Sequence, residues 1–232
     1  MGPPGVGKFE YCTELALNFL DRRGRVVFVA VDVNPFDVRR LAAQRGHDLL
    51  REKRFVFVHC ISPYAQSSFC CENANSCCIK SETHAESIGA AIGEAISRVG
   101  KPIRVFLCTM SSLLLYNSPK DVIKLFHAIT KDVKDDYGFA AFVLHSGIHL
   151  PSVQRILEAG VDGIIEWRYG GNDRRQYKVR RYRGLALSLR WRSFLDADFS
   201  SPLGGKRIDQ FLVNQEVDLN ETPEKENGMS EA

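Results

Sequence analysis

A phosphate-binding pattern occupies the start of the chain. Residues 2–8 read G-P-P-G-V-G-K, which satisfies the G-x-x-x-x-G-K spacing of a P-loop. In such a loop successive backbone N–H groups surround the phosphates, and the lysine contacts the β- and γ-phosphate oxygens. We call residues 2–8 the phosphate loop and predict that its phosphate-binding groups belong to Gly2, Gly5, Val6, Gly7 and Lys8.

The residue after the lysine departs from this pattern. Phe9 stands where Ser or Thr would ligate Mg²⁺ through its hydroxyl. Phe9 therefore borders the predicted nucleotide site without offering a metal ligand. A helix predicted from Phe9 to about Arg23 would direct its N-terminus at the bound anion. The pattern also requires a strand before the loop, and we expect that strand either to lie upstream of Met1 or to be missing from the sheet.

Apolar runs alternate with amphipathic stretches through the first two thirds of the chain. Runs rich in β-branched and aromatic residues predict strands at 25–31, 55–61, 103–108 and 139–145. Further helices are predicted at 36–53, 86–99, 119–134 and 151–159. Strands that alternate with helices in this way form right-handed βαβ units. The predicted fold class is therefore α/β with a mostly parallel sheet flanked by helices.

The last third of the chain has a different pattern. Residues 163–168, 176–183 and 185–194 predict strands with no helices between them, and period-two alternation indicates antiparallel pairing. Arginine and lysine alternate with aromatic residues over residues 174–192, which we call the basic hairpin. Two interpretations stay open for it. It is either a solvated basic face or a surface on which single-stranded nucleic acid stacks.

Composition places the chain among ordinary globular proteins, with 44% hydrophobic and 25% charged residues. Without a long uncharged apolar stretch or a signal peptide, the sequence predicts a cytoplasmic protein with no membrane association. Residues 211–232 hold six acids and one base, so their net charge is −5 and the rest of the chain carries +8. We expect residues 1–207 to form one nucleotide-binding domain and residues 208–232 an acidic disordered tail.

Seven cysteines in a chain without a secretory signal argue against a disulfide framework. Four of them share one predicted loop: Cys70, Cys71, Cys77 and Cys78. They are a weak zinc candidate, because their spacing matches no common zinc pattern, and plain loop thiols are the simpler interpretation. A zinc-stabilised interaction protein is therefore a further, weaker hypothesis beside the functions given below. The other three lie in apolar runs and are predicted to be core thiols: Cys12, Cys60 and Cys108.

The arrangement of these motifs resembles the RecA-like ATPases, specifically their KaiC-like branch. That family carries a P-loop, a strand ending in an acidic pair before proline, a strand ending in Asp-Ser and a V-x-K-M-R-G hairpin. The corresponding segments here are 2–8, 32–35, 108–111 and 179–184, and 162–166 is similar to the family's D-G-V-I-E strand. The resemblance covers roughly residues 2–194. It implies a RecA-like P-loop NTPase fold with ATP or ADP as the ligand.

Three departures from the family fall on metal binding and water activation. Phe9 replaces the hydroxyl ligand, Val33 replaces the acid that polarises the attacking water, and Cys108 replaces the aspartate that organises Mg²⁺. Phosphoryl transfer depends on positioning and on Mg²⁺. The resemblance therefore implies a degenerate domain with little or no ATPase activity, and leaves the role of Mg²⁺ open. Asp32 is the weak candidate for a remaining catalytic carboxylate, and a helix-capping role is its alternative.

The resemblance implies further contacts. His145 ends a predicted strand where the family places a γ-phosphate sensor, although a solvated strand end is the simpler interpretation. Ser111 and Ser112 either replace the missing hydroxyl or cap the following segment. Arg181 and Arg183 correspond to residues that reach the neighbouring subunit's nucleotide, which implies a homo-oligomer or a RecA-like or KaiC-like paralogue as partner.

Three functions follow from these features. The first is regulation through nucleotide-sensitive assembly of a domain that does not turn over its nucleotide. An active ATPase of the RecA or KaiC type is the second. The third is a nucleic-acid-binding module that uses the basic hairpin.

Overall fold

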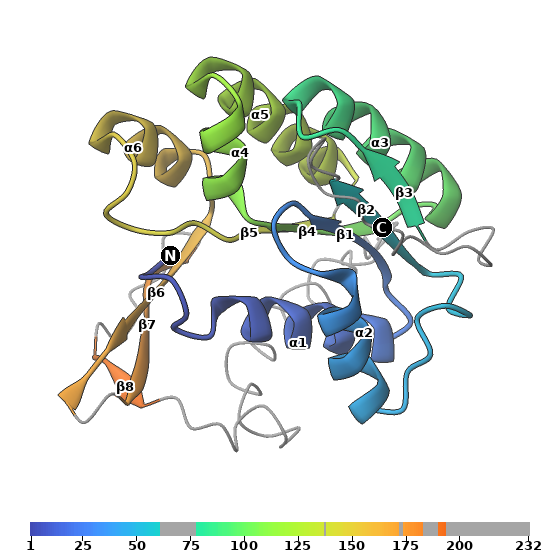
Figure 1. Cartoon of the computed structure of the whole chain (residues 1–232), viewed down its shortest axis with the longest axis horizontal. Helices are drawn as coiled ribbons and strands as arrows, with labels where there is room; N and C mark the ends of the chain where they lie inside the picture. Colours follow the sequence, from blue (N-terminus) through green and yellow to red (C-terminus); the bar gives the residue numbers. More distant parts are fainter. Residues whose placement is uncertain (61–77, 137, 172–173, 183–189, 194–232) are drawn as a thin grey trace, which may run out of the picture. The chain divides into compact units, whose positions relative to one another are not determined.

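The computed structural model describes residues 1–60, 78–136, 138–171, 174–182 and 190–193. Within them one sheet has the strand order β3-β2-β1-β4-β5, and a second has the order β6-β7-β8 (Figure 1). The first sheet contains β1 (Arg25–Ala30), β2 (Phe55–Cys60), β3 (Cys78–Ser81), β4 (Ile103–Cys108) and β5 (Phe139–Phe142). The second contains β6 (Gly163–Tyr169), β7 (Arg175–Tyr182) and β8 (Arg192–Ser193).

Neighbouring strands are parallel throughout the first sheet and antiparallel in the second. This confirms the predicted α/β class with a parallel sheet and an antiparallel C-terminal extension. The helices are α1 (Lys8–Asp21), α2 (Pro35–Gln44), α3 (Ala85–Val99), α4 (Met110–Tyr116), α5 (Pro119–Asp135) and α6 (Pro151–Ala159). Helices α1 and α2 cover one face of the parallel sheet, and α3 and α5 cover the other (Figure 1).

Polar side chains cap three of the helices. Asn34 accepts a hydrogen bond from the Phe36 amide at the start of α2, Thr109 accepts one from Ser112 in α4, and Ser118 accepts one from Asp121 in α5. Each cap satisfies a backbone donor that has no partner within the helix. These caps set where the chain turns from a strand or loop into a helix.

The structure corrects several predicted bounds. The helix predicted at 36–53 ends at Gln44, where Gly46 adopts a positive φ of 82° and its amide bonds to the Ala43 carbonyl. The strand predicted at 139–145 ends at Phe142. Helix α4 and strand β3 were not predicted, and both are short elements of seven and four residues.

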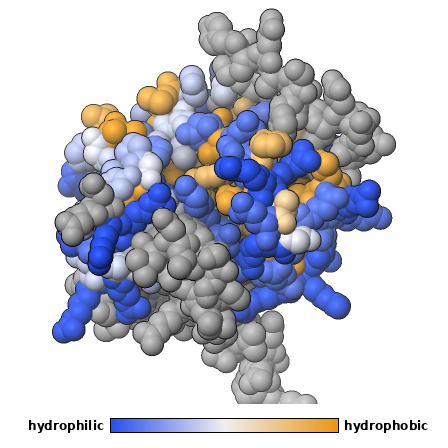
Figure 2. All heavy atoms as spheres, turned by 60° about the horizontal axis from the view of Figure 1, so that its bottom comes forward, coloured by the Kyte–Doolittle hydropathy of each residue, from blue (hydrophilic) through white to orange (hydrophobic). Residues whose placement is uncertain are grey.

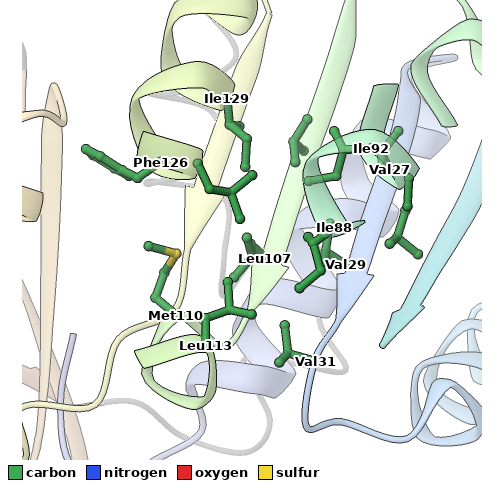
Figure 3. Packing of buried hydrophobic residues seen from close by; sticks show 14 of the residues in the cluster. Val27, Val29, Val31, Ile88, Ile92, Leu107, Met110, Leu113, Phe126 and Ile129 are labelled. Atoms are coloured by element: carbon green, nitrogen blue, oxygen red, sulfur yellow. The ribbon is translucent and has the colours of Figure 1, made fainter. Parts of the chain in front are cut away.

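Alternating side chains of the buried strands form two separate layers. Val27, Val29 and Val31 face α3, where Ile88 and Ile92 pack against them (Figure 3). On the other face, the Phe28 ring lies between other rings, with centroid distances of 6.2 Å to Phe55, 6.0 Å to Phe57 and 6.3 Å to Phe106. Because both faces are covered, the strands read as continuous apolar runs rather than alternating ones.

The first two residues lie between the edges of the two sheets. Four backbone hydrogen bonds hold them: Gly2 N to Leu144 O (3.3 Å), Ser146 N to Gly2 O (3.1 Å), Met1 N to Ile165 O (2.6 Å) and Trp167 N to Met1 O (2.7 Å). The bonds to Gly2 form a parallel bridge with His145, and the bonds to Met1 flank Glu166 as in parallel pairing. The phosphate loop therefore begins just beyond the carboxyl end of β5 and beside the middle of β6.

Among the predictions that fall outside the described residues are the acidic tail at 208–232 and most of the strand at 185–194. Among the helices that the structure describes, none has the length and apolarity needed to cross a membrane.

Replacement of Phe28 by alanine tests the aromatic layer. Phe28 is fully buried, so Phe28→Ala should lower the free energy of unfolding by about 3–5 kcal/mol through lost burial and the cavity it leaves. Urea denaturation followed by circular dichroism measures the change. Phe36→Ala removes a ring that is 51% exposed and should cost less than about 1 kcal/mol. Equal losses in the two variants would contradict the assignment of Phe28 to the core.

Candidate functional site

The phosphate loop owes its shape to glycines. Gly5 and Gly7 have φ angles of 74° and 96°, in the left-handed region that glycine adopts without steric cost. Gly7 is the N-cap residue of α1, and Lys8 is the first residue of that helix. Gly2 is required for a different reason, because a Cβ there would lie 2.6 Å from the Trp167 carbonyl oxygen. The predicted glycine positions are thus the positions where the turn and the neighbouring strand demand glycine.

The Lys8 side chain turns back into the phosphate loop. Its Nζ donates hydrogen bonds to the carbonyl oxygens of Gly2, at 2.8 Å, and of Pro3. Lys8 is only 5% exposed, and burial lowers the pKa of its ammonium from 10.5 to about 8, partly opposed by Glu10. A phosphate oxygen entering the loop would compete with these two carbonyls for the ammonium.

Val6 and Phe9 flank the last two residues of the phosphate loop, Gly7 and Lys8. Phe9 is the second residue of α1 and half-buried, and its ring offers no oxygen to a metal ion. Val6 is fully buried and anchors the loop against the body of the domain. The loop therefore presents backbone amides and one ammonium, with no side-chain hydroxyl at position 9.

A cluster of hydroxyl groups surrounds Asp32 at the carboxyl ends of β1 and β4. The Asp32 Oδ2 atom accepts hydrogen bonds from Thr109 Oγ1 at 3.1 Å and from Ser112 Oγ at 2.5 Å. The Val31 amide donates to the Cys108 carbonyl at 2.7 Å, and this strand pairing brings the two segments together. The helix-capping alternative for Asp32 is wrong, because Asn34 caps α2. Ser112 holds this carboxylate and is not a cap, whereas Thr109 caps α4.

His145 lies beside the loop and is held by Ser111. The His145 amide donates to Ser111 Oγ at 2.8 Å, and the same hydroxyl lies 2.8 Å from His149 Nε2. Burial lowers the pKa of His145, and the Lys8 charge lowers it further while Asp32 opposes the change. Its Nδ1 atom is buried and has no hydrogen-bond partner among the described residues. The structure thus gathers Lys8, Asp32 and His145 in one neighbourhood, as the sequence predicts for a site at the sheet's carboxyl edge.

Two thiols, of Cys12 on α1 and Cys108 on β4, lie in contact between this helix and the sheet. Cys108 is fully buried, and its Sγ lies 3.4 Å from the Sγ of Cys12, one helical turn after Lys8. Burial, together with the hydrogen bond to Cys12, raises the pKa of the Cys108 thiol well above its usual range. Cys60 is buried as well, so the prediction that these three cysteines are core thiols is confirmed.

Acidic side chains of the same chain pair with two cations of the basic hairpin, Lys178 and Arg180. Lys178 and Arg180 both pair with Glu166 at 2.8 Å, and Arg180 also pairs with Glu158. Arg181 donates to the carbonyl oxygens of Glu158 and Val161 near the end of α6. The proposed contact of Arg181 with a neighbouring subunit stays a prediction, and Arg183 lies outside the described residues.

Three of the four cysteines named in the zinc hypothesis lie outside the described residues. Cys70, Cys71 and Cys77 belong to the segment that is not described, and Cys78 begins β3. In the described part of the chain, no group of three or more His, Cys, Asp and Glu side chains could hold a metal ion.

Sequence reasoning missed two residues of this neighbourhood. Thr109 directly follows a predicted buried strand, and a polar residue at the carboxyl end of a parallel strand could have been predicted to lie in the site. His149 gave no such signal, because only the folded loop before α6 brings it to Ser111.

Comparison with solved structures identifies the fold. The KaiC-like protein PH0186 from the hyperthermophilic archaeon Pyrococcus horikoshii OT3 is similar over 84% of this chain and 82% of that chain, with a TM-score of 0.60 and 14% sequence identity. The fold is RecA-like. No family model matches the sequence, and no curated protein matches it. The RecA-like fold places the phosphate loop, Asp32 and His145 at the carboxyl edge of the parallel sheet, where such folds bind ligands.

The lowered pKa of Lys8 predicts that phosphate affinity of the loop depends on pH. Because this pKa is about 8 rather than 10.5, the ammonium is charged below about pH 8 and neutral above it. If the phosphate loop binds ADP, we expect the affinity to fall about tenfold between about pH 7 and pH 9, since the neutral amine loses its charge-assisted bond to phosphate. Calorimetric titration at several pH values measures this change. The pKa of His145 is lowered, so this side chain stays neutral across the range.

The control is Lys8→Ala, whose weaker affinity should be independent of pH over the same range. A parallel fall in the variant would assign the pH dependence to another group.

Proposed function

We propose that this chain is a degenerate KaiC-like domain that binds ATP or ADP and turns it over little or not at all. The observation that carries the proposal is the phosphate loop, in which Lys8 starts α1 and holds its ammonium inside the turn. Backbone amides at a helix N-terminus together with a buried ammonium are suited to an anionic phosphate chain. A phosphate that accepts hydrogen bonds from Lys8 Nζ, in place of the Gly2 and Pro3 carbonyl oxygens, would compensate the positive charge of the ammonium.

The structure also supports the loss of hydrolysis. Phe9 offers no oxygen, and Cys108 is packed against Cys12 rather than free to organise a metal. Removal of one transition-state stabiliser typically lowers a rate by about 10²–10³. Two or three such losses together reduce turnover further, although their effects are not simply additive.

Asp32 is the residue on which an active ATPase would depend. Its carboxylate is oriented by hydrogen bonds from Thr109 and Ser112. The charges of Asp32 and Lys8 both act on the pKa of His145, so the three side chains lie near one another. An active enzyme would need this single carboxylate to replace both the metal-organising aspartate and the water-polarising acid. For that reason we favour binding without turnover.

The proposal includes regulation through nucleotide-sensitive assembly with itself or with a KaiC-like paralogue. Exposed apolar side chains support an interaction surface, among them Leu115 on α4 and Ile148 and Leu150 before α6. Figure 2 shows a largely hydrophilic face on which apolar side chains gather in a few patches. His149, between Ile148 and Leu150, contacts Ser111, so this loop is connected to the residues beside the phosphate loop.

A nucleic-acid-binding module is the second candidate, and two cation–aromatic contacts of Trp191 favour it. The Trp191 ring lies 4.0 Å from the Arg168 guanidinium carbon and 4.6 Å from Lys178 Nζ. Such a cation–aromatic group is suited to stacking with bases. Because Lys178 also pairs with Glu166, less positive charge is available for phosphates. Binding to single-stranded DNA that weakens steeply with added salt would favour this candidate over the first.

Titration with a fluorescent ATP analogue tests nucleotide binding. We expect binding that changes less than about threefold when Mg²⁺ is removed, because the loop lacks the hydroxyl that ligates the metal. Lys8→Ala should weaken binding at least about tenfold, since a charge-assisted hydrogen bond is lost. Lys131→Ala, which removes an exposed lysine of α5, is the matched control and should bind as the unmodified protein does. Equal affinities for all three proteins would exclude the phosphate loop as the site.

Phosphate release measures turnover in the same preparations. We expect no release above that of Lys8→Ala, because metal positioning and water activation are both missing. Mg²⁺-dependent release that disappears in Asp32→Asn would instead establish the active ATPase. Sedimentation with and without ATP then measures assembly, and an unchanged mass would count against nucleotide-sensitive assembly.

A further inference from the structure

Tyr169 lies beside the phosphate loop, although it is distant from the loop in sequence. A Cβ built on Gly5 would lie 3.3 Å from the Tyr169 hydroxyl oxygen, so the phenol oxygen lies next to the space that a side chain at Gly5 would occupy. Gly5 itself is exposed and has a left-handed φ of 74°. The hydroxyl therefore stands next to the part of the loop that an incoming ligand can reach.

Strand register explains why Tyr169 reaches the loop. The Met1 backbone pairs with Ile165 and Trp167, so β6 runs beside the segment that enters the loop. Side chains two residues apart lie on the same face of a strand. Trp167 packs against Tyr11 of α1, with ring centroids 5.2 Å apart, and Tyr169 follows on the same face at the level of Gly5.

The environment of Tyr169 differs from that of a core aromatic residue. Trp167 is 5% exposed, whereas Tyr169 is 45% exposed. No residue that the structure describes forms a hydrogen bond with the Tyr169 hydroxyl. An O–H donor beside a phosphate-binding loop is thus available to a ligand. Packing alone accounts for Trp167 but leaves the position of the Tyr169 hydroxyl unexplained.

We infer that Tyr169 is a nucleotide-contact residue whose hydroxyl donates a hydrogen bond to a phosphate oxygen held in the phosphate loop. The inference rests on the proposed function, since the loop must first hold a phosphate chain. A hydroxyl that donates to an ionised phosphate forms a charge-assisted bond. The contact restores a hydroxyl donor near the phosphates without restoring a metal ligand. Tyr169 thus adds to binding and leaves the loss of turnover unchanged.

A contact with phosphate differs from stacking of the ring on the base. Tyr169→Phe keeps the ring and removes only the oxygen, so it separates the two possibilities. Tripolyphosphate carries the phosphate chain without a base, and it therefore reports only the phosphate contact. Tyr116→Phe is the matched control, because Tyr116 is an exposed tyrosine on α4 outside the loop.

The experiment compares calorimetric titrations of ATP and tripolyphosphate into the unmodified protein, Tyr169→Phe and Tyr116→Phe. We expect Tyr169→Phe to bind both ligands about tenfold more weakly, and Tyr116→Phe to bind as the unmodified protein does. Unchanged or tighter binding by Tyr169→Phe would overturn the inference and leave the proposed function standing. Weaker binding of ATP alone would also overturn it, because the contact would then involve the nucleoside. Failure of the unmodified protein to bind either ligand would refute the proposed function itself.

Discussion

The candidate site depends on the backbone hydrogen bonds that hold Met1 and Gly2 between β5 and β6. These bonds set where the phosphate loop leaves the sheet, and so determine where α1 and Lys8 begin. They also fix the register of β6, which brings Trp167 against Gly2 and Tyr169 beside Gly5. A shift of one residue in this pairing would turn the aromatic side chains of β6 to the other face of the strand. The loop and the strand that accompanies it are therefore one structural unit.

A second dependence links the carboxyl ends of β1 and β4. Their parallel pairing places Asp32 next to Thr109 and Ser112, and the carboxylate gains two hydroxyl donors that are far from it in sequence. The same pairing buries Cys108 against Cys12 of α1. A carboxylate buried at position 108 would need compensation by a cation, whereas a thiol is accepted there as a small apolar group. A thiol at position 108 therefore lets α1 pack on the sheet through an uncharged contact with Cys12.

Sequence alone predicted the features that local chemistry determines. The glycines of the phosphate loop mark positions of unusual φ or close approach, and the apolar runs of β1 and β4 mark strands buried on both faces. Features set by tertiary contacts were missed. Strand β3 exists through its pairing with β2, and α2 ends early where Arg45 forms ion pairs with Glu14 and Asp21 of α1. Tyr169 approaches Gly5 only through strand register, which no local pattern encodes.

The internal hydrogen bonds of Lys8 have a consequence for how the loop would respond to its ligand. A loop whose ammonium is already satisfied keeps its shape when empty, so binding requires little ordering of the backbone. Each new bond to phosphate replaces an existing bond to a carbonyl, and the affinity is the difference between the two sets. Under the proposed function, a nucleotide would bind only as strongly as that difference allows, and the occupancy of the loop would rise and fall with the surrounding nucleotide concentration.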